Sequence, residues 1–253
     1  LNSQTREEKD RFSADISFVG SMYHKNSYDD IKDKLPPYLR GYFDAAMLAQ
    51  LNIYGDNIID ELLTVDILKQ LSEFVDFRQD KRAFSDIRLV FESTFLGFKL
   101  ANIERVRTLN LLAKKNKVAL YTDEQDTSLI NVDFKGTVDY MNDMPKVFNN
   151  SSINLNMTIR NIRTGIPLRV WDILGAGGFL LTNYQIELTD YFKNEESIVY
   201  YEDMYDCCKK AEYYLLHEDK RRQIAAKGHE LVSKKHSYIN RVKYILDVIG
   251  KMS

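Results

Sequence analysis

The sequence predicts an α/β fold: a doubly wound parallel sheet that carries a helical insertion. Short apolar runs of strand character alternate with helical patterns along most of the 253 residues, which is typical of parallel sheets. Residues 28–116 read as helical almost throughout, far more than one crossover helix needs. We therefore expect a domain over residues 14–237 with an all-helical insertion at about 28–78.

The elements follow one another in a regular order. A linker is expected at 1–13, and helical patterns lie at 144–149, 167–174, 187–192 and 204–216. From Asp219 to the end we expect a pair of charged amphipathic helices, the last (238–253) a crossover helix. Six strands are expected, at 14–20, 117–122, 137–140, 153–157, 179–184 and 197–201.

Composition excludes some functions and favours one compartment. The 35 basic and 37 acidic residues leave a net charge of −2, which argues for neither nucleic acid nor an anionic membrane as partner. The longest uncharged run near the glycines, 173–186, is too short and too polar to span a bilayer, and the polar N-terminus predicts no signal peptide. The adjacent Cys207 and Cys208 favour a reducing cytoplasm. A first residue of Leu suggests a fragment of a longer enzyme.

One stretch contains a glycine run that needs a physical explanation: TGIPLRVWDILGAGGFLLTNY (164–184). Gly175, Gly177 and Gly178 fall within four positions, whereas a left-handed helix end needs only one glycine. The others suggest that the backbone passes close to another helix or to a ligand. The spacing and its place before a strand exclude a dinucleotide-binding glycine motif.

The loop before this helix, 158–166, is expected at the carboxyl edge of the sheet, where ligands of such folds bind. It carries Arg160, Arg163 and Gly165, and Pro167 suits the first position of the helix. Free backbone N–H groups at a helix N-terminus, flanked by arginines, form a natural seat for a phosphate or diphosphate.

Arg169 and Asp172 are three residues apart, hence on one face of the helix. Two interpretations stay open from spacing alone. The pair could form a surface salt bridge, or Asp172 could accept hydrogen bonds from the paired hydroxyls of a sugar.

The stretch INLNMTIRNIRTGIPLRVWDILGAGGFLLTNY (153–184) resembles the sugar-nucleotide-binding half of glycosyltransferases with two Rossmann-like domains, the GT-B type. The resemblance is to the CgeB-like family of bacterial spore maturation proteins and prophage-borne transferases. It extends through DISFVGSMY, GYFDAAMLAQLNIYG, VALYT, GTVDYMNDMP, SIVYYEDMYD and HEDKRRQIAAKG, and so covers nearly the whole chain.

Related transferases carry two glutamates eight residues apart, the second opening a segment that ends in glycine. Laid onto this chain, the second glutamate falls on Asp172, the glycine on Gly177 and the first glutamate on Thr164, which is not acidic. The resemblance therefore implies that Asp172 holds the nucleotide ribose, and that Arg163 and Arg169 supply the missing electrostatics.

The resemblance also implies contacts at the other strands. The turn Gly20–Ser21 would border the donor diphosphate, with Lys25 nearby, although Lys25 could equally be a solvated loop lysine. Tyr140 and Met144 would contact the nucleobase, although Tyr140 could equally be a core residue at a strand end.

The function that this resemblance implies is transfer of a sugar from a nucleotide-diphosphate sugar to a sugar or glycan acceptor. No two aspartates are separated by one residue, so we expect no metal and no other cofactor. The alternatives are a non-catalytic nucleotide-sugar-binding or structural spore-coat module, and an epimerase or phosphorylase-like enzyme.

Only one Rossmann-like half is visible, so the resemblance implies a missing N-terminal acceptor domain, and we assign no catalytic base. The last helix would normally pack on that half. Its apolar stripe, Tyr238, Val242, Ile245 and Ile249, is therefore expected to lie partly uncovered and to promote self-association.

Overall fold

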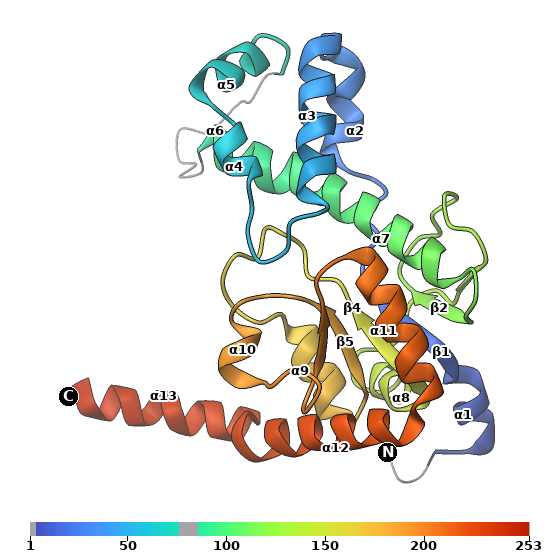
Figure 1. The fold of residues 1–253 in the computed structure, drawn as a ribbon. Helices are drawn as coiled ribbons and strands as arrows, with labels where there is room; N and C mark the ends of the chain where they lie inside the picture. The colour runs from blue at the N-terminus through green and yellow to red at the C-terminus, as the bar shows by residue number, and fades with distance from the viewer. Residues whose placement is uncertain (1–3, 76–85, 253) are drawn as a thin grey trace.

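The structure, a computed structural model, describes residues 4–75 and 86–252. Its centre is a six-stranded parallel sheet with the order β3-β2-β1-β4-β5-β6, the arrangement of a Rossmann-like doubly wound fold (Figure 1). The strands are β1 (Ala14–Val19), β2 (Val118–Tyr121), β3 (Val132–Phe134), β4 (Ser151–Asn156), β5 (Leu180–Asn183) and β6 (Val199–Tyr201).

Five of the six expected strands are confirmed, and the third is wrong in position. Residues 137–140 lack strand structure, and β3 lies earlier, with Val132 paired to Val118 of β2. The reason is Gly136, whose φ of 71° turns the chain away from the sheet edge. The β-branched and aromatic residues after this turn imitate a strand, whereas the true edge strand is three residues long and only half-buried.

Helices cover both faces of the sheet. On one face, α7 (Phe98–Leu112) and α11 (Met204–Leu216) pack on β1, β2 and β4 through a core that includes Leu109 and Tyr214. On the other face, α8 (Met144–Asn150) and α9 (Leu168–Gly175) contribute Phe148 and Ile173 to a second core. The helices α10 (Leu188–Tyr191) and α12 (Glu218–Lys235) also belong to the body, and α12 contributes side chains to both cores.

Between β1 and β2 the chain forms a helical layer above the carboxyl edge of the sheet (Figure 1). This layer, here called the insertion, has its own core around Phe43, Leu71 and Phe91. Residues 76–78 of the expected insertion lie outside the described residues, and helices continue beyond them to Gly97. The insertion contains α2 (Ser27–Ile31), η1 (Lys32–Lys34), α3 (Pro37–Gln50), α4 (Ile59–Leu62), α5 (Val65–Ser72), α6 (Ile87–Val90) and the π-helical η2 (Phe91–Gly97).

The expected linker at 1–13 is wrong for residues 6–12, which form the helix α1 (Arg6–Phe12). Thr5 and Glu8 make a reciprocal capping box at its start, and Phe12 is buried. Glu8 also accepts a hydrogen bond from Lys146 of α8 at 2.6 Å. The Thr-x-x-Glu spacing was a readable start signal within an otherwise polar segment.

The glycine run closes α9 and fixes its position. Gly177 has a φ of 78°, and the N–H groups of Gly177 and Gly178 donate to the carbonyls of Leu174 and Ile173, which makes a Schellman motif. A Cβ on Gly178 would lie 2.7 Å from the Phe148 carbonyl and 2.6 Å from Asn154 Nδ2. The second glycine is therefore needed because the chain passes close to α8 and β4.

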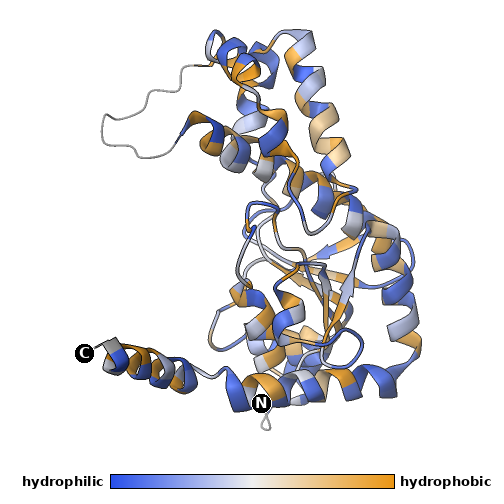
Figure 2. Cartoon of the chain, turned by 60° about the vertical axis from the view of Figure 1, so that its left-hand side comes forward, coloured by the Kyte–Doolittle hydropathy of each residue, from blue (hydrophilic) through white to orange (hydrophobic). Residues whose placement is uncertain are grey.

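The last helix, α13 (Tyr238–Met252), extends away from the body (Figures 1 and 2). Its apolar stripe is exposed, with Tyr238 at 82% and Val242 and Ile245 each at 54%. Self-association through this stripe stays a prediction, which sedimentation of the isolated chain can check. Among the described helices, none is both long and apolar enough to cross a membrane.

We predict that Gly178→Ala destabilises the chain by roughly 1–3 kcal/mol, because the added methyl group meets backbone and a buried amide that cannot give way. Gly175→Ala is the matched control, since nothing lies within 4 Å of its Cβ position. Urea unfolding of both variants measures the difference. Equal stabilities would contradict the close approach.

Candidate functional site

The strand order reverses between β1 and β4, so the connections leave these neighbouring strands in opposite directions along the sheet. Ligands of open α/β sheets bind at such a point, beyond the carboxyl ends of the strands. Two pockets lie at this edge. The first, here called the β1–β3 pocket, is lined by Val19, Gly20, Ser21, Tyr121, Thr122, Asp123, Thr137, Val138, Tyr140, Met144 and Arg169.

The Asp172 carboxylate is bonded to two residues that line the β1–β3 pocket, while Asp172 itself lines a further pocket with residues of α12 and α13. Tyr140 Oη donates to Asp172 Oδ1 at 2.9 Å, and Arg169 Nη1 donates to Asp172 Oδ2 at 3.3 Å. The hydrogen bond to Asp172 raises the pKa of the Tyr140 hydroxyl, while burial lowers the pKa of the Arg169 guanidinium. The salt bridge that spacing allowed is thus present, and the fold adds a phenol from 32 residues away.

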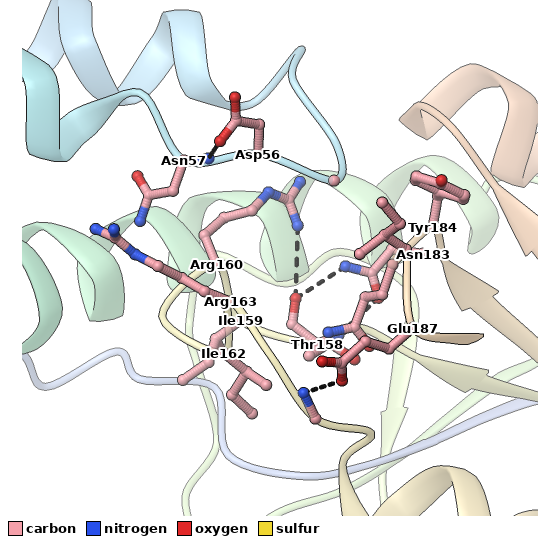
Figure 3. Close-up of a pocket in the computed structure, with 14 residues that line it drawn as sticks. Asp56, Asn57, Thr158, Ile159, Arg160, Ile162, Arg163, Asn183, Tyr184 and Glu187 are labelled. Carbon is pink, nitrogen blue, oxygen red and sulfur yellow. Dashed lines mark hydrogen bonds between the residues drawn. The ribbon is translucent and has the colours of Figure 1, made fainter. Parts of the chain in front are cut away.

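The second pocket lies between the insertion and the loops that follow β4 and β5 (Figure 3). We call it the insertion pocket. In its floor, Thr158 and Asn183 exchange two hydrogen bonds of 2.8 and 2.9 Å, which join the ends of the two strands. It is lined by Gly55, Asp56, Asn57, Thr158, Ile159, Arg160, Ile162, Arg163, Gly165, Asn183, Tyr184, Gln185, Ile186 and Glu187.

Arg160, expected near a diphosphate, is buried in an ion pair. Its Nη2 donates to Glu104 Oε1 of α7 at 3.1 Å, and its guanidinium lies 4.0 Å from the centre of the Tyr54 ring. Burial is the largest single influence and opposes the charge, but the Glu104 carboxylate together with the hydroxyls of Tyr54 and Tyr201 raises the pKa of Arg160. Tyr54 Oη donates to the same carboxylate at 2.9 Å, so this cluster connects the insertion, α7 and the loop after β4.

Arg163 is held by the insertion as well. Its Nη2 donates to Glu92 Oε1 at 2.6 Å and its Nη1 lies 3.4 Å from Asp60 Oδ2. The hydrogen bond to Glu92 raises the pKa of Arg163. Thr164 is exposed next to these residues, beside a surface depression that it shares with Asp60 and Glu92.

Most of the other expected site residues lie at the carboxyl edge of the sheet, and Gly177 lies at the opposite, amino edge. Gly20, Ser21 and Met144 line the β1–β3 pocket with Tyr140 and Arg169, while Gly165 lines the insertion pocket. Lys25 lies outside both linings and pairs with Glu124 at 2.8 Å, its side chain 77% exposed. Gly177 precedes β5 and therefore lies at the amino edge, where its helix-ending role accounts for it.

Sequence reasoning missed Arg105 on α7. This buried guanidinium donates from Nη1 to the Ser21 carbonyl and from Nη2, at 2.7 Å, to the Met157 carbonyl. It therefore joins the ends of β1 and β4 at the switch point, and burial lowers its pKa. The buried face of α7 also carries the polar residues Asn102, Glu104 and Thr108, so the sequence pattern gave no clear signal for Arg105. Within residues 4–75 and 86–252, no group of three His, Cys, Asp or Glu could hold a metal ion.

A family model described as glycosyl transferase-like matches residues 102–247, more than half of the chain. The match runs from α7 to α13 and so includes β2–β6, Asp172 and both loop arginines. A comparison with curated protein sequences gave no significant match.

Three solved structures are similar at a low level. A crystal structure of TarM is 14% identical over 56% of this chain and 31% of its own, with a TM-score of 0.45. A mutant of S. aureus TarM with Fondaparinux, alpha-GlcNAc-glycerol and UDP is 13% identical over 73% and 42%, with a TM-score of 0.45. T4 phage BGT with UDP-glucose is 13% identical over 92% and 75%, at 0.42. The chain thus spans less than half the length of either TarM structure.

We predict that Arg160→Met destabilises the chain by about 3–5 kcal/mol, because it leaves the buried Glu104 carboxylate without its cation. The double variant Arg160→Met with Glu104→Gln should recover much of this loss, since the amide still accepts from Tyr54. Denaturant unfolding of the double variant and of each single variant, Arg160→Met and Glu104→Gln, measures the coupling. Losses that simply add would show that the two side chains do not act as a pair.

Proposed function

The chain belongs to the glycosyl transferase-like family, and from that premise we propose that it is the donor-binding domain of a GT-B glycosyltransferase. It binds a nucleotide-diphosphate sugar, and the sugar passes to an acceptor. One observation carries the proposal: on the helix whose N-terminus faces the switch point, the Asp172 carboxylate is bonded to Tyr140 and Arg169, and both of these residues line the β1–β3 pocket.

The nucleoside occupies the β1–β3 pocket. Tyr140, 48% exposed at its rim, offers a ring face to the base, and Met144 provides an apolar contact below. The ribose hydroxyls donate to Asp172 in place of the Tyr140 hydroxyl, which turns toward solvent. This exchange costs little free energy, because the carboxylate gives up one hydrogen bond and accepts others from a better-placed diol.

The diphosphate lies at the N-terminus of α9. Pro167 at the N-cap makes no side-chain hydrogen bond to the first turn, and the Val170 N–H donates to the Pro167 carbonyl. The N–H groups of Leu168 and Arg169 therefore remain for a ligand, at the positive end of the helix dipole. Gly165, just before α9, lines one pocket, and Arg169, in its first turn, lines the other. A diphosphate at this point therefore connects the two pockets.

Donor activation uses no metal in this proposal. The leaving diphosphate is stabilised by the α9 N-terminus and by Arg169, which can exchange its bond to Asp172 for one to phosphate. The acceptor is positioned by a separate N-terminal domain, which also covers the exposed stripe of α13.

The decisive test compares nucleosides with nucleoside diphosphates. In a calorimetric panel of uridine, guanosine, adenosine and their diphosphates, we expect one diphosphate to bind much more tightly than its nucleoside. Added salt should narrow this preference, because part of it is charge attraction. EDTA should change nothing. Equal affinities of nucleoside and diphosphate would refute the phosphate seat, and loss of binding with EDTA would refute metal independence.

Asp172→Asn should weaken binding of that diphosphate by about ten- to a hundredfold, because hydrogen bonds to a charged group contribute roughly 1.5–3 kcal/mol each. Asp190→Asn, on the surface of α10 and outside the two pocket linings, is the control. Unchanged affinity in a folded Asp172→Asn variant would mean that Asp172 serves only as the salt-bridge partner of Arg169.

A further inference from the structure

We propose that Asp123 selects the nucleobase of the donor, and that the selected base is guanine. Asp123 lies two residues after the last residue of β2 and lines the β1–β3 pocket. The inference rests on the proposed function, which puts a nucleoside in this pocket without deciding its base.

The charged side chains of the pocket come from opposite sides of β1. Among the described residues that line it, only Asp123 and Arg169 carry a charge. Asp123 follows β2, on one side of β1, whereas Arg169 lies on α9, which follows β4 on the other side. Repulsion between like charges keeps a diphosphate away from Asp123. The uncharged base is therefore the part of the nucleotide that meets this carboxylate.

The Asp123 carboxylate is ionised and accessible. The hydrogen bond from the Thr122 hydroxyl to its Oδ1, at 3.1 Å, lowers its pKa, and the backbone N–H groups of Asp123 and Glu124 add to this effect. Asp123 is exposed and forms no ion pair with any described residue, because the nearby His24 and Lys25 are bonded to Glu124 at 2.6 and 2.8 Å. A carboxylate has about four acceptor positions, so capacity for a ligand remains.

The residues on both sides of Asp123 are held in place. Glu124 is bonded to the loop after β1, as described above. Asp126, which is 8% exposed, accepts from Asn102 Nδ2 of α7 at 3.2 Å, and the same amide donates to the Met22 carbonyl at 2.9 Å. The loop that carries Asp123 is thus ordered before a ligand binds, which reduces the entropy lost on binding.

The hydrogen-bonding edges of the bases differ in what they offer a carboxylate. Guanine carries two donors side by side, the ring N1–H and the 2-amino group, so both carboxylate oxygens can accept in a bidentate pair. Uracil has one ring N–H between two carbonyl oxygens, which a carboxylate repels. Adenine and cytosine each have one amino group beside an acceptor nitrogen. Of these four bases, guanine alone can form two charge-assisted hydrogen bonds with Asp123.

The other side chains of the lining discriminate little between bases. Tyr140 offers a ring face on which any base can stack, and the hydroxyls of Thr122 and Thr137 can donate or accept. The volume of the pocket, about 280 Å³, lies near the lower end of the range for small-molecule pockets, so it suits a base rather than a whole nucleotide sugar. Among the lining side chains, Asp123 therefore decides the base.

The first test uses the wild-type 253-residue chain in calorimetric titrations with GDP, inosine diphosphate, ADP and UDP. Inosine diphosphate differs from GDP only in lacking the 2-amino group. We expect it to bind about ten- to a hundredfold more weakly than GDP, because one hydrogen bond to a charged group is lost. ADP and UDP should also bind more weakly than GDP.

The second test exchanges the carboxylate for an amide. In Asp123→Asn, xanthosine diphosphate should bind more tightly than GDP, because its C2 carbonyl accepts from the new amide N–H while the amide oxygen accepts from the ring N1–H. Asp190→Asn, on α10 and outside the β1–β3 pocket, is the matched control and should keep the wild-type order of affinities. A purely structural role of Asp123 would weaken all diphosphates by one common factor.

Three results would overturn the inference: equal affinities of the wild-type chain for GDP and inosine diphosphate, tighter binding of UDP than of GDP, or an unchanged order in Asp123→Asn. Each of these results still includes binding of a diphosphate, so the proposed function would stand. Failure of every diphosphate to bind the wild-type chain would overturn the proposed function and the inference together.

Discussion

The buried ion pair between Arg160 and Glu104 holds the parts of the site together. Arg160 comes from the loop after β4 and Glu104 from α7, while Tyr54 of the insertion both stacks on the guanidinium and donates to the carboxylate. The two charged groups are buried and each would be costly alone, and the partly buried Tyr54 contacts both, so the three constrain one another. As a result, the insertion stays over the carboxyl edge of the sheet, where it forms the upper wall of a pocket.

This arrangement gives the two pockets at the edge different chemistry. The arginines of the loop would attract phosphate if they were unpaired. Here they form ion pairs with carboxylates of α7 and the insertion. What remains for an anion is the N-terminus of α9 with Arg169, between the β1–β3 pocket and the insertion pocket.

The far end of α9 contributes to the site without touching it. The Schellman motif at Gly177 ends the helix, and the close approach of Gly178 to Phe148 and Asn154 leaves α9 little freedom to shift against α8 and β4. Asp172 and Arg169 lie on that helix, so their position relative to Tyr140 is set partly by the glycines. In this chain the glycine run is a packing constraint, and its effect on a ligand is indirect.

The sequence by itself determined the features that depend on neighbours along the chain. Periodicity located five strands and the helix that carries Asp172, and three-residue spacing placed Arg169 beside that carboxylate. The prediction was wrong at β3, where a left-handed glycine displaced the strand, and at α1, where the readable Thr-x-x-Glu start signal in a polar segment was not used. Tertiary structure alone decided the partners of Arg160 and Arg163, because Glu104 and Glu92 lie 56 and 71 residues away. Charge pairing across the fold depends on three-dimensional proximity, and no pattern within a single segment contains that information.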